Sequence, residues 1–151
     1  IIDRYSIKYI KEELKKKDLS NVFVTQAGYD EEIDYKIDFL VVSKDEIDAV
    51  EANKLLNEDF VNWILLTSSN LPARLLSRDG VVEIAPPDFK TINSTGAGDI
   101  TAAYIGAFGI EDVIETTKNA CAAGALLAGS STFPSLTKIK EISELVEINP
   151  R

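Results

Sequence analysis

Short continuous runs of apolar residues, separated by segments with a helical pattern, constrain the fold of this chain most strongly. The runs lie at residues 21–25 (NVFVT), 38–42 (DFLVV) and 63–67 (WILLT). Each predicts a strand buried on both faces, which is typical of parallel sheets covered by helices on both sides. Helices predicted at residues 4–17 and 44–56 alternate with these strands, and an acidic connection is expected at residues 28–36. The sequence therefore predicts a Rossmann-like α/β three-layer sandwich with a mainly parallel sheet, formed by residues 1–151 as a single domain.

The remaining elements follow from capping and turn signals. Ser43 is placed to cap the helix at 44–56, and Glu46 stands three residues further on, which is the spacing of a capping box. Residues 73–77 and 81–85 predict a hairpin, because the sequence RDG at 78–80 between them is a strong turn signal. Further helices are predicted at residues 97–108, 111–128 and 137–147.

A glycine-rich loop at residues 93–99 (NSTGAGD) runs directly into the helix predicted at 97–108. Gly96 and Gly98 let the backbone approach a ligand closely, and the N–H groups at the helix start would converge on an anion, most commonly phosphate. Asp99 adds a carboxylate that can accept the proton of a hydroxyl group. An anion cradle beside a base is the basic equipment for phosphoryl transfer. The same pattern is also met where a loop only starts a helix and the aspartate offsets the dipole.

The composition excludes several other chemistries. The chain has no histidine and one cysteine, Cys121, so Ser-His and Cys-His catalysis and cysteine–histidine metal sites are excluded. Cys121 stands among small residues and is interpreted as a packing residue. The formal net charge of −9 argues against nucleic acid or an anionic membrane as a partner. Because no apolar run reaches about 18 residues and no signal-peptide pattern is visible, we expect a cytoplasmic protein.

The segment TGAGD at residues 95–99, followed by a helix of small residues, resembles the second signature of the ribokinase-like (PfkB) carbohydrate kinases. The resemblance implies a ribokinase-like fold and transfer of the ATP γ-phosphoryl group, with Mg²⁺, to a hydroxyl of a sugar, polyol or nucleoside. It makes Asp99 the catalytic base and Gly96, Ala97 and Gly98 the anion hole. Kinases of this family are about twice as long as this chain, so we expect a partial chain that lacks the N-terminal half and the lid.

The resemblance covers most of the chain from about residue 38 to residue 145. Glu46 falls on the family glutamate that influences magnesium and phosphate binding, although Ser43 replaces the family asparagine. Thr67 ends a strand where the family has Thr-x-Gly-x-x-Gly, but Ser69 and Pro72 replace both glycines. By resemblance, the predicted nucleotide contacts are Thr67, Ser69, Thr95 and Asn119, and the predicted metal contact is Glu46.

Some departures leave alternatives open. Asn93 replaces the aspartate that many relatives use in a monovalent-cation site, so the resemblance leaves dependence on potassium undecided. The changed positions are also compatible with a non-catalytic relative that binds a nucleotide or metabolite. A dinucleotide-binding dehydrogenase domain is a weaker reading, because Thr101 stands where a third glycine would be required. The substrate, the phosphate donor and the oligomeric state stay open, and the family resemblance allows a homodimer.

Overall fold

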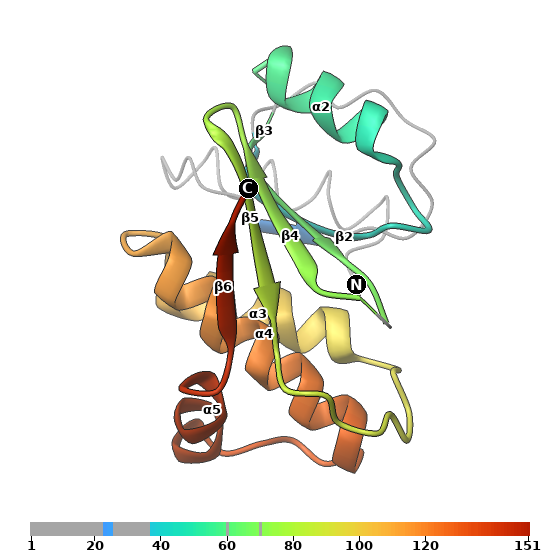
Figure 1. The fold of residues 1–151 in the computed structure, drawn as a ribbon, viewed down its shortest axis with the longest axis vertical. Helices are drawn as coiled ribbons and strands as arrows, with labels where there is room; N and C mark the ends of the chain where they lie inside the picture. Colours follow the sequence, from blue (N-terminus) through green and yellow to red (C-terminus); the bar gives the residue numbers. More distant parts are fainter. Residues whose placement is uncertain (1–22, 26–36, 60, 70) are drawn as a thin grey trace, which may run out of the picture.

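The computed structural model describes residues 23–25, 37–59, 61–69 and 71–151. Within these residues six strands form one sheet in sequence order, β1-β2-β3-β4-β5-β6 (Figure 1). The first three strands pair in parallel, and the pairings from β3 to β6 are antiparallel. The strands are β1 (Phe23–Thr25), β2 (Ile37–Ser43), β3 (Val61–Thr67), β4 (Ala73–Ser77), β5 (Gly80–Ala85) and β6 (Glu147–Pro150).

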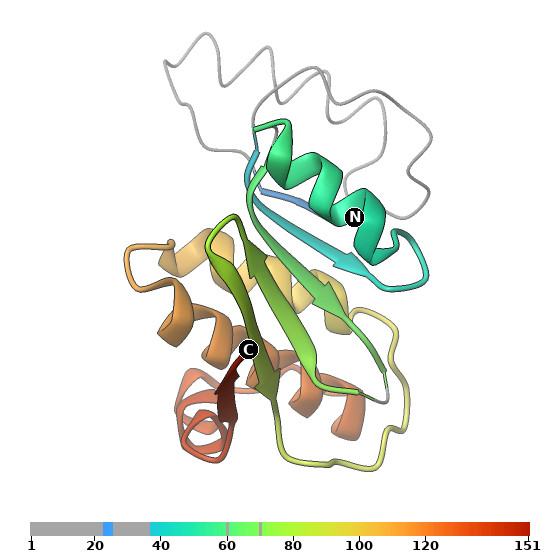
Figure 2. The same ribbon diagram turned by 45° about the horizontal axis from the view of Figure 1, so that its top comes forward.

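Helices cover both faces of this sheet. The described helices are α2 (Ala49–Asn57), α3 (Ala97–Phe108), α4 (Val113–Ser130) and α5 (Leu136–Ser143). Helix α2 packs on one face, and α3, α4 and α5 lie together on the other (Figure 2). The structure thus confirms the predicted α/β three-layer architecture. The described sheet is mixed rather than mainly parallel, because the hairpin of β4 and β5 and the C-terminal strand β6 add antiparallel pairings to the parallel strands β1 to β3.

Strand β2 shows why the apolar runs in the sequence are continuous. Phe39 and Val41 are buried on the side of α3 and α4, whereas Leu40 and Val42 are buried on the side of α2. Successive side chains of a strand point to opposite faces, so a strand between two helical layers needs apolar residues at every position. Full burial of one such side chain contributes about 1.5–3 kcal/mol.

The N-terminus of α2 differs from the prediction. The helix begins at Ala49, and its cap is Asp48, whose side chain accepts from the N–H groups of Val50 and Glu51. Glu51 closes the capping box by accepting from the Asp48 N–H group at 3.2 Å. The predicted cap, Ser43, instead ends β2, where it pairs with Thr67 of β3. Strand pairing therefore extends through Ser43, and the helix starts at the next suitable cap.

Other predicted elements are reproduced closely. Helix α3 has the predicted bounds, and β4 and β5 form the predicted hairpin. The last helix ends at Ser143 rather than at residue 147, because residues 147–150 form β6 beside β5. The helix expected at 4–17 and the connection expected at 28–36 fall outside the described residues. No helix in the described part of the chain is long and apolar enough to cross a membrane.

Candidate phosphoryl-transfer site

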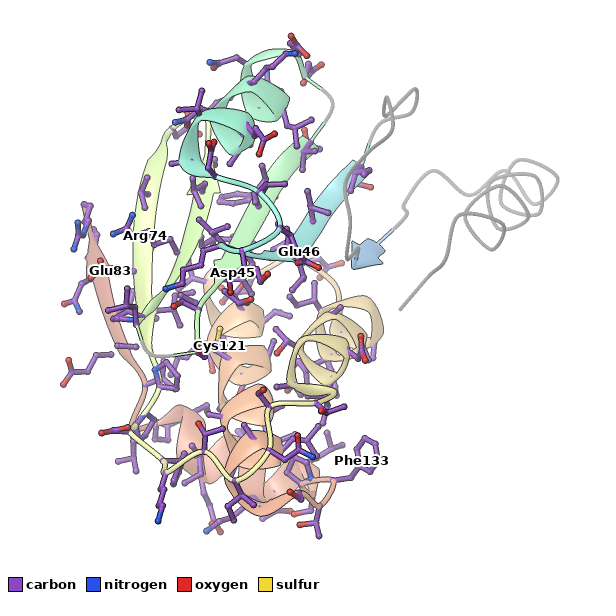
Figure 3. The ribbon with its side chains drawn as sticks, turned by 90° about the vertical axis from the view of Figure 1, so that its right-hand side faces the viewer. Asp45, Glu46, Arg74, Glu83, Cys121 and Phe133 are labelled. Atoms are coloured by element: carbon purple, nitrogen blue, oxygen red, sulfur yellow. The ribbon has the colours of Figure 1, made fainter. Side chains whose placement is uncertain are left out.

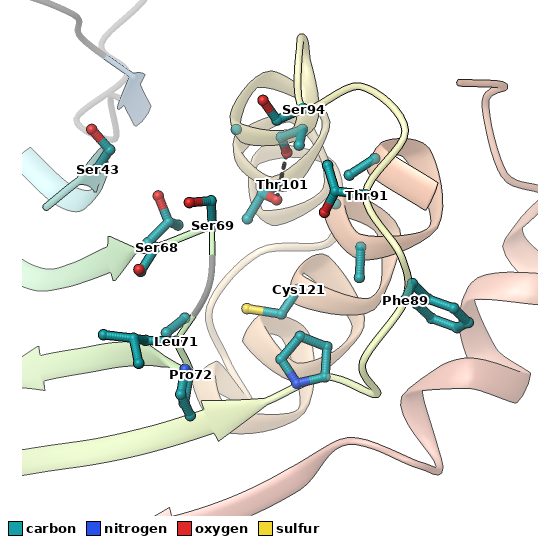
Figure 4. A pocket seen from close by; sticks show the side chains of 18 of the residues that line it. Ser43, Ser68, Ser69, Leu71, Pro72, Phe89, Thr91, Ser94, Thr101 and Cys121 are labelled. Carbon is teal, nitrogen blue, oxygen red and sulfur yellow. Dashed lines mark hydrogen bonds between the residues drawn. The ribbon is translucent and has the colours of Figure 1, made fainter. Parts of the chain in front are cut away.

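A cleft of about 970 Å³ opens where the ends of β2 and β3 approach the start of α3 (Figure 4). Its walls come from the ends of these strands, from residues 85–91, from the glycine loop and from α4. Most of the predicted site residues line this cleft, although they come from three separate segments of the chain. They are Glu46, Thr67, Ser69, Thr95, Gly96, Ala97, Gly98 and Asp99.

The glycine loop adopts a tight turn that ends directly in a helix. The Asn93 side-chain oxygen accepts from the Thr95 N–H group at 3.0 Å, and the Ala97 N–H group donates to the Ser94 carbonyl at 3.1 Å. Gly96 caps α3 with a φ of 82°, in the left-handed region that favours glycine. No side chain caps this helix. The positive end of the helix dipole therefore lies at the cleft, which Gly96, Ala97 and Gly98 line, and it favours an anion there.

Gly98 and Asp99 stand at the mouth of this turn. A Cβ atom added to Gly98 would meet no atom within 4 Å, so the space in front of this residue is open to a ligand. Asp99 lies in the first turn of α3, is half-buried and lines the same cleft. The arrangement places a carboxylate beside the backbone of the glycine loop, and the roles of base and anion hole stay predictions.

The start of α3 is packed closely against α4. The Thr101 hydroxyl donates to the Ala97 carbonyl at 2.8 Å and also lies 3.3 Å from the Ala120 carbonyl of α4. A Cβ atom at Gly124 would stand 2.6 Å from the Thr101 hydroxyl oxygen and 3.1 Å from the Ala97 carbonyl oxygen. Only a glycine at this position of α4 leaves the observed separation of the two helices undisturbed.

The opposite wall of the cleft is formed by the ends of β2 and β3. The Glu46 carboxylate accepts from the Ser43 N–H group at 2.7 Å, which fixes it beside the strand end. Asp45 and Glu46 lie next to each other above the layer of α3 and α4 (Figure 3). The Thr67 hydroxyl donates to the Val42 carbonyl over a long 3.4 Å, so this interaction is easily exchanged for another partner.

Residues 68, 69, 71 and 72 form the part of the cleft that departs most from the kinase pattern. Ser69, Leu71 and Pro72 line the cleft, and Leu71 is exposed. The Ser68 hydroxyl oxygen is buried and has no hydrogen-bond partner within the structure described. A buried hydroxyl left in this state costs about 1–3 kcal/mol. Ser68 was not predicted as a site residue, because a single serine after a strand is common in loops.

Helix α4, on which the predicted nucleotide contact Asn119 stands, contributes a third wall through other residues. Cys121, Gly124, Ala125 and Ala128 line the cleft. The Cys121 side chain points into it (Figure 4), and burial raises the pKa of its thiol to about 12. Cys121 thus belongs to the packed core and to the cleft wall, which extends its interpretation as a packing residue.

Asn119 is not brought into the cleft. Its side-chain amide donates to the Glu115 carbonyl at 2.8 Å and to the Glu115 carboxylate at 3.2 Å, one turn earlier on α4. Asn119 does not appear among the described residues that line the cleft. Its assignment as a nucleotide contact therefore stays a prediction.

The fold is shared with solved kinase structures, although neither a family model nor a curated protein matches the sequence. A putative phosphofructokinase from Staphylococcus aureus is 19% identical and aligns with 99% of this chain and 54% of its own, with a TM-score of 0.78. Phosphofructokinase-2 from Escherichia coli, solved with substrates and products, is 13% identical over 95% of this chain and 53% of its own, with a TM-score of 0.72. A putative ribokinase II from E. coli, in complex with ATP and Mg²⁺, is 20% identical over 72% of this chain and 40% of its own, with a TM-score of 0.62.

The chain therefore has the ribokinase-like fold, as the sequence resemblance predicted. It corresponds to the C-terminal part of the phosphofructokinases and spans about half of their length. At identities of 13–20% the similarity establishes the fold.

Proposed function

We propose that this chain is the nucleotide-binding part of a cytoplasmic carbohydrate kinase, which transfers the γ-phosphoryl group of ATP to a hydroxyl of a sugar, polyol or nucleoside. One observation carries the proposal. The glycine loop, Asp99 and the ends of β2 and β3 line a single cleft, although they are distant in sequence. The kinase names of the structural neighbours support the same reaction class.

The proposed chemistry needs few groups. Asp99 accepts the proton of the acceptor hydroxyl, while the N–H groups at the start of α3 stabilise the charge on the phosphoryl group in transfer. A loose phosphoryl-transfer transition state asks mainly for positioning and electrostatic stabilisation. A rigid turn at Gly96 and a helix fixed against α4 at Gly124 provide such positioning.

The residues present also fit a magnesium nucleotide. Four carboxylates and one lysine, Lys90, line the described cleft, so a polyphosphate would be repelled unless a cation accompanied it. Mg²⁺ commonly binds one or two carboxylates and completes its shell with phosphate oxygens and water. Asp45 and Glu46 provide oxygen ligands of this kind at the edge of the cleft. When bound, the ion would neutralise charge on the phosphates.

The proposal is tested on the complete gene product with a coupled assay for ADP release, over a panel of sugars, polyols and nucleosides. Replacing Asp99→Asn removes the base and is expected to lower kcat by about 10²-fold or more. Asp112→Asn is the matched control, because Asp112 caps α4 outside the cleft and asparagine caps helices equally well. Normal turnover in the Asp99→Asn variant would refute the assignment.

The same assay distinguishes the kinase from a non-catalytic relative that binds a nucleotide or metabolite. A non-catalytic relative would gain thermal stability on binding MgATP and release no ADP with any acceptor. The changed residues of the β3–β4 connection, Ser69 and Pro72, are the observation that favours this second function, because both line the cleft.

A further inference from the structure

We propose that Thr101 is a positioning residue that orients the Gly98 N–H group toward the phosphoryl group, an inference that rests on the function proposed above. Thr101 is 4% exposed and lies one turn beyond the glycine loop on α3. Its hydroxyl acts on the loop through the Ala97 carbonyl, at 2.8 Å.

Thr101 is connected to the Gly98 N–H group through a single peptide group. The Ala97 carbonyl and the Gly98 N–H group belong to the same planar trans peptide, so they point in opposite directions. A bond that holds the carbonyl along the axis of α3 therefore holds the N–H group toward the cleft, which Gly98 lines. A Cβ atom added to Gly98 would meet nothing within 4 Å, so no neighbouring atom crowds the side-chain position of this residue.

A second contact anchors this peptide to the rest of the fold. The Thr101 hydroxyl also lies 3.3 Å from the Ala120 carbonyl of α4, so its single proton is shared between the two helices. Gly124 on the same helix allows the approach, because a Cβ atom there would stand 2.6 Å from the Thr101 hydroxyl oxygen. Threonine divides between two χ1 rotamers in a helix, and the bond to the Ala97 carbonyl favours the one observed.

Thr117 offers an internal comparison. It is fully buried on α4, and its hydroxyl donates to the Val113 carbonyl at 2.6 Å, again four residues earlier in a helix. Its bond therefore has the same local chemistry as that of Thr101. Thr117 does not line the described cleft, so the same substitution there tests the structural effect without the effect on the site.

The experiment compares Thr101→Val, Thr101→Ser and Thr117→Val in the complete protein. Valine keeps the shape and removes the hydroxyl, whereas serine restores it. We expect kcat to fall about 10-fold or more in Thr101→Val with a small change in KM for MgATP, since the misplaced donor acts mainly in the transition state. Thr101→Ser is expected to recover most of kcat. Thr117→Val is expected to lose stability and keep kcat.

A second measurement monitors the Gly98 N–H group directly. In ¹⁵N-labelled protein titrated with inorganic phosphate, the Gly98 amide signal is expected to shift in the parent and in Thr117→Val, and to shift much less in Thr101→Val. If the parent turns over no acceptor, the proposed function fails, and this titration still decides the role of Thr101. A folded Thr101→Val variant with unchanged kcat and an unchanged Gly98 shift would overturn the inference, as would equal losses of kcat in Thr101→Val and Thr117→Val.

Discussion

Gly124→Ala is the substitution whose cost can be worked out most directly from the structure. The new Cβ atom would lie 2.6 Å from the Thr101 hydroxyl oxygen and 3.1 Å from the Ala97 carbonyl oxygen. Neither atom can move away cheaply, because one is backbone and the other is held by its bond to Ala97. Overpacking of this kind costs about 1–3 kcal/mol. Alanine also gains about 0.8–1 kcal/mol of helix propensity over glycine.

The net expectation is a loss of about 1 kcal/mol in the free energy of unfolding, because the middle of the range for strain exceeds the gain in propensity. Urea unfolding of the purified protein measures this loss. The strain acts on Ala97, so turnover is expected to fall as well.

A double-mutant cycle isolates the contact. Thr101→Ala removes the hydroxyl oxygen that the new Cβ atom meets, so Gly124→Ala is expected to cost less in that background, by about 1 kcal/mol. Thr101→Val keeps an atom in the same place and is expected to give no such relief. If Gly124→Ala stabilises the protein, or costs the same in all three backgrounds, the argument from the helix contact is refuted.

Two further expectations concern elements away from the glycine loop. Asp48→Ala removes the capping box of α2 and is expected to lower the free energy of unfolding by about 1 kcal/mol, measured by urea unfolding, whereas Ser43→Ala leaves that cap intact. Burial raises the pKa of the Cys121 thiol from 9.0 to about 12, so the reactive thiolate is nearly absent at pH 9. Iodoacetamide is therefore expected to label Cys121 at pH 9 only after unfolding, as mass spectrometry would show; rapid labelling of the folded protein would contradict the burial. Because the pKa is raised in the folded state, this group's contribution to stability is full below pH 9 and is lost as the pH rises toward 12.

The local elements of the fold could be predicted because their signals lie within a few residues. The turn at residues 78–80 sets the hairpin of β4 and β5, and the two glycines around Ala97 set the start of α3. Continuous apolar runs indicated the central strands, since both faces of β2 and β3 are covered. Each of these signals acts through backbone conformation or burial that nearby residues determine.

Features that depend on pairing with distant residues were predicted less well. Ser43 and Asp48 both begin a pattern that suits a capping box, and only the pairing of Ser43 with Thr67 decides between them. Strand β6 has four residues with little strand pattern, and it exists because the edge of β5 is there to pair with. The residues around Ser43 and in β6 do not indicate that Thr67 and β5 are their pairing partners.

Helix α4 shows the same limit within the candidate site. Its small residues can be recognised in the sequence as suited to close packing, and Ala120 and Gly124 do pack against the start of α3. Gly124 also lines the cleft, together with Cys121 and Ala125 of the same helix. Because small side chains serve both purposes, their pattern predicts close approach without saying what approaches. The structure decides this, since the contacts of Thr101 and Ala97 place Ala120 and Gly124 beside the start of α3.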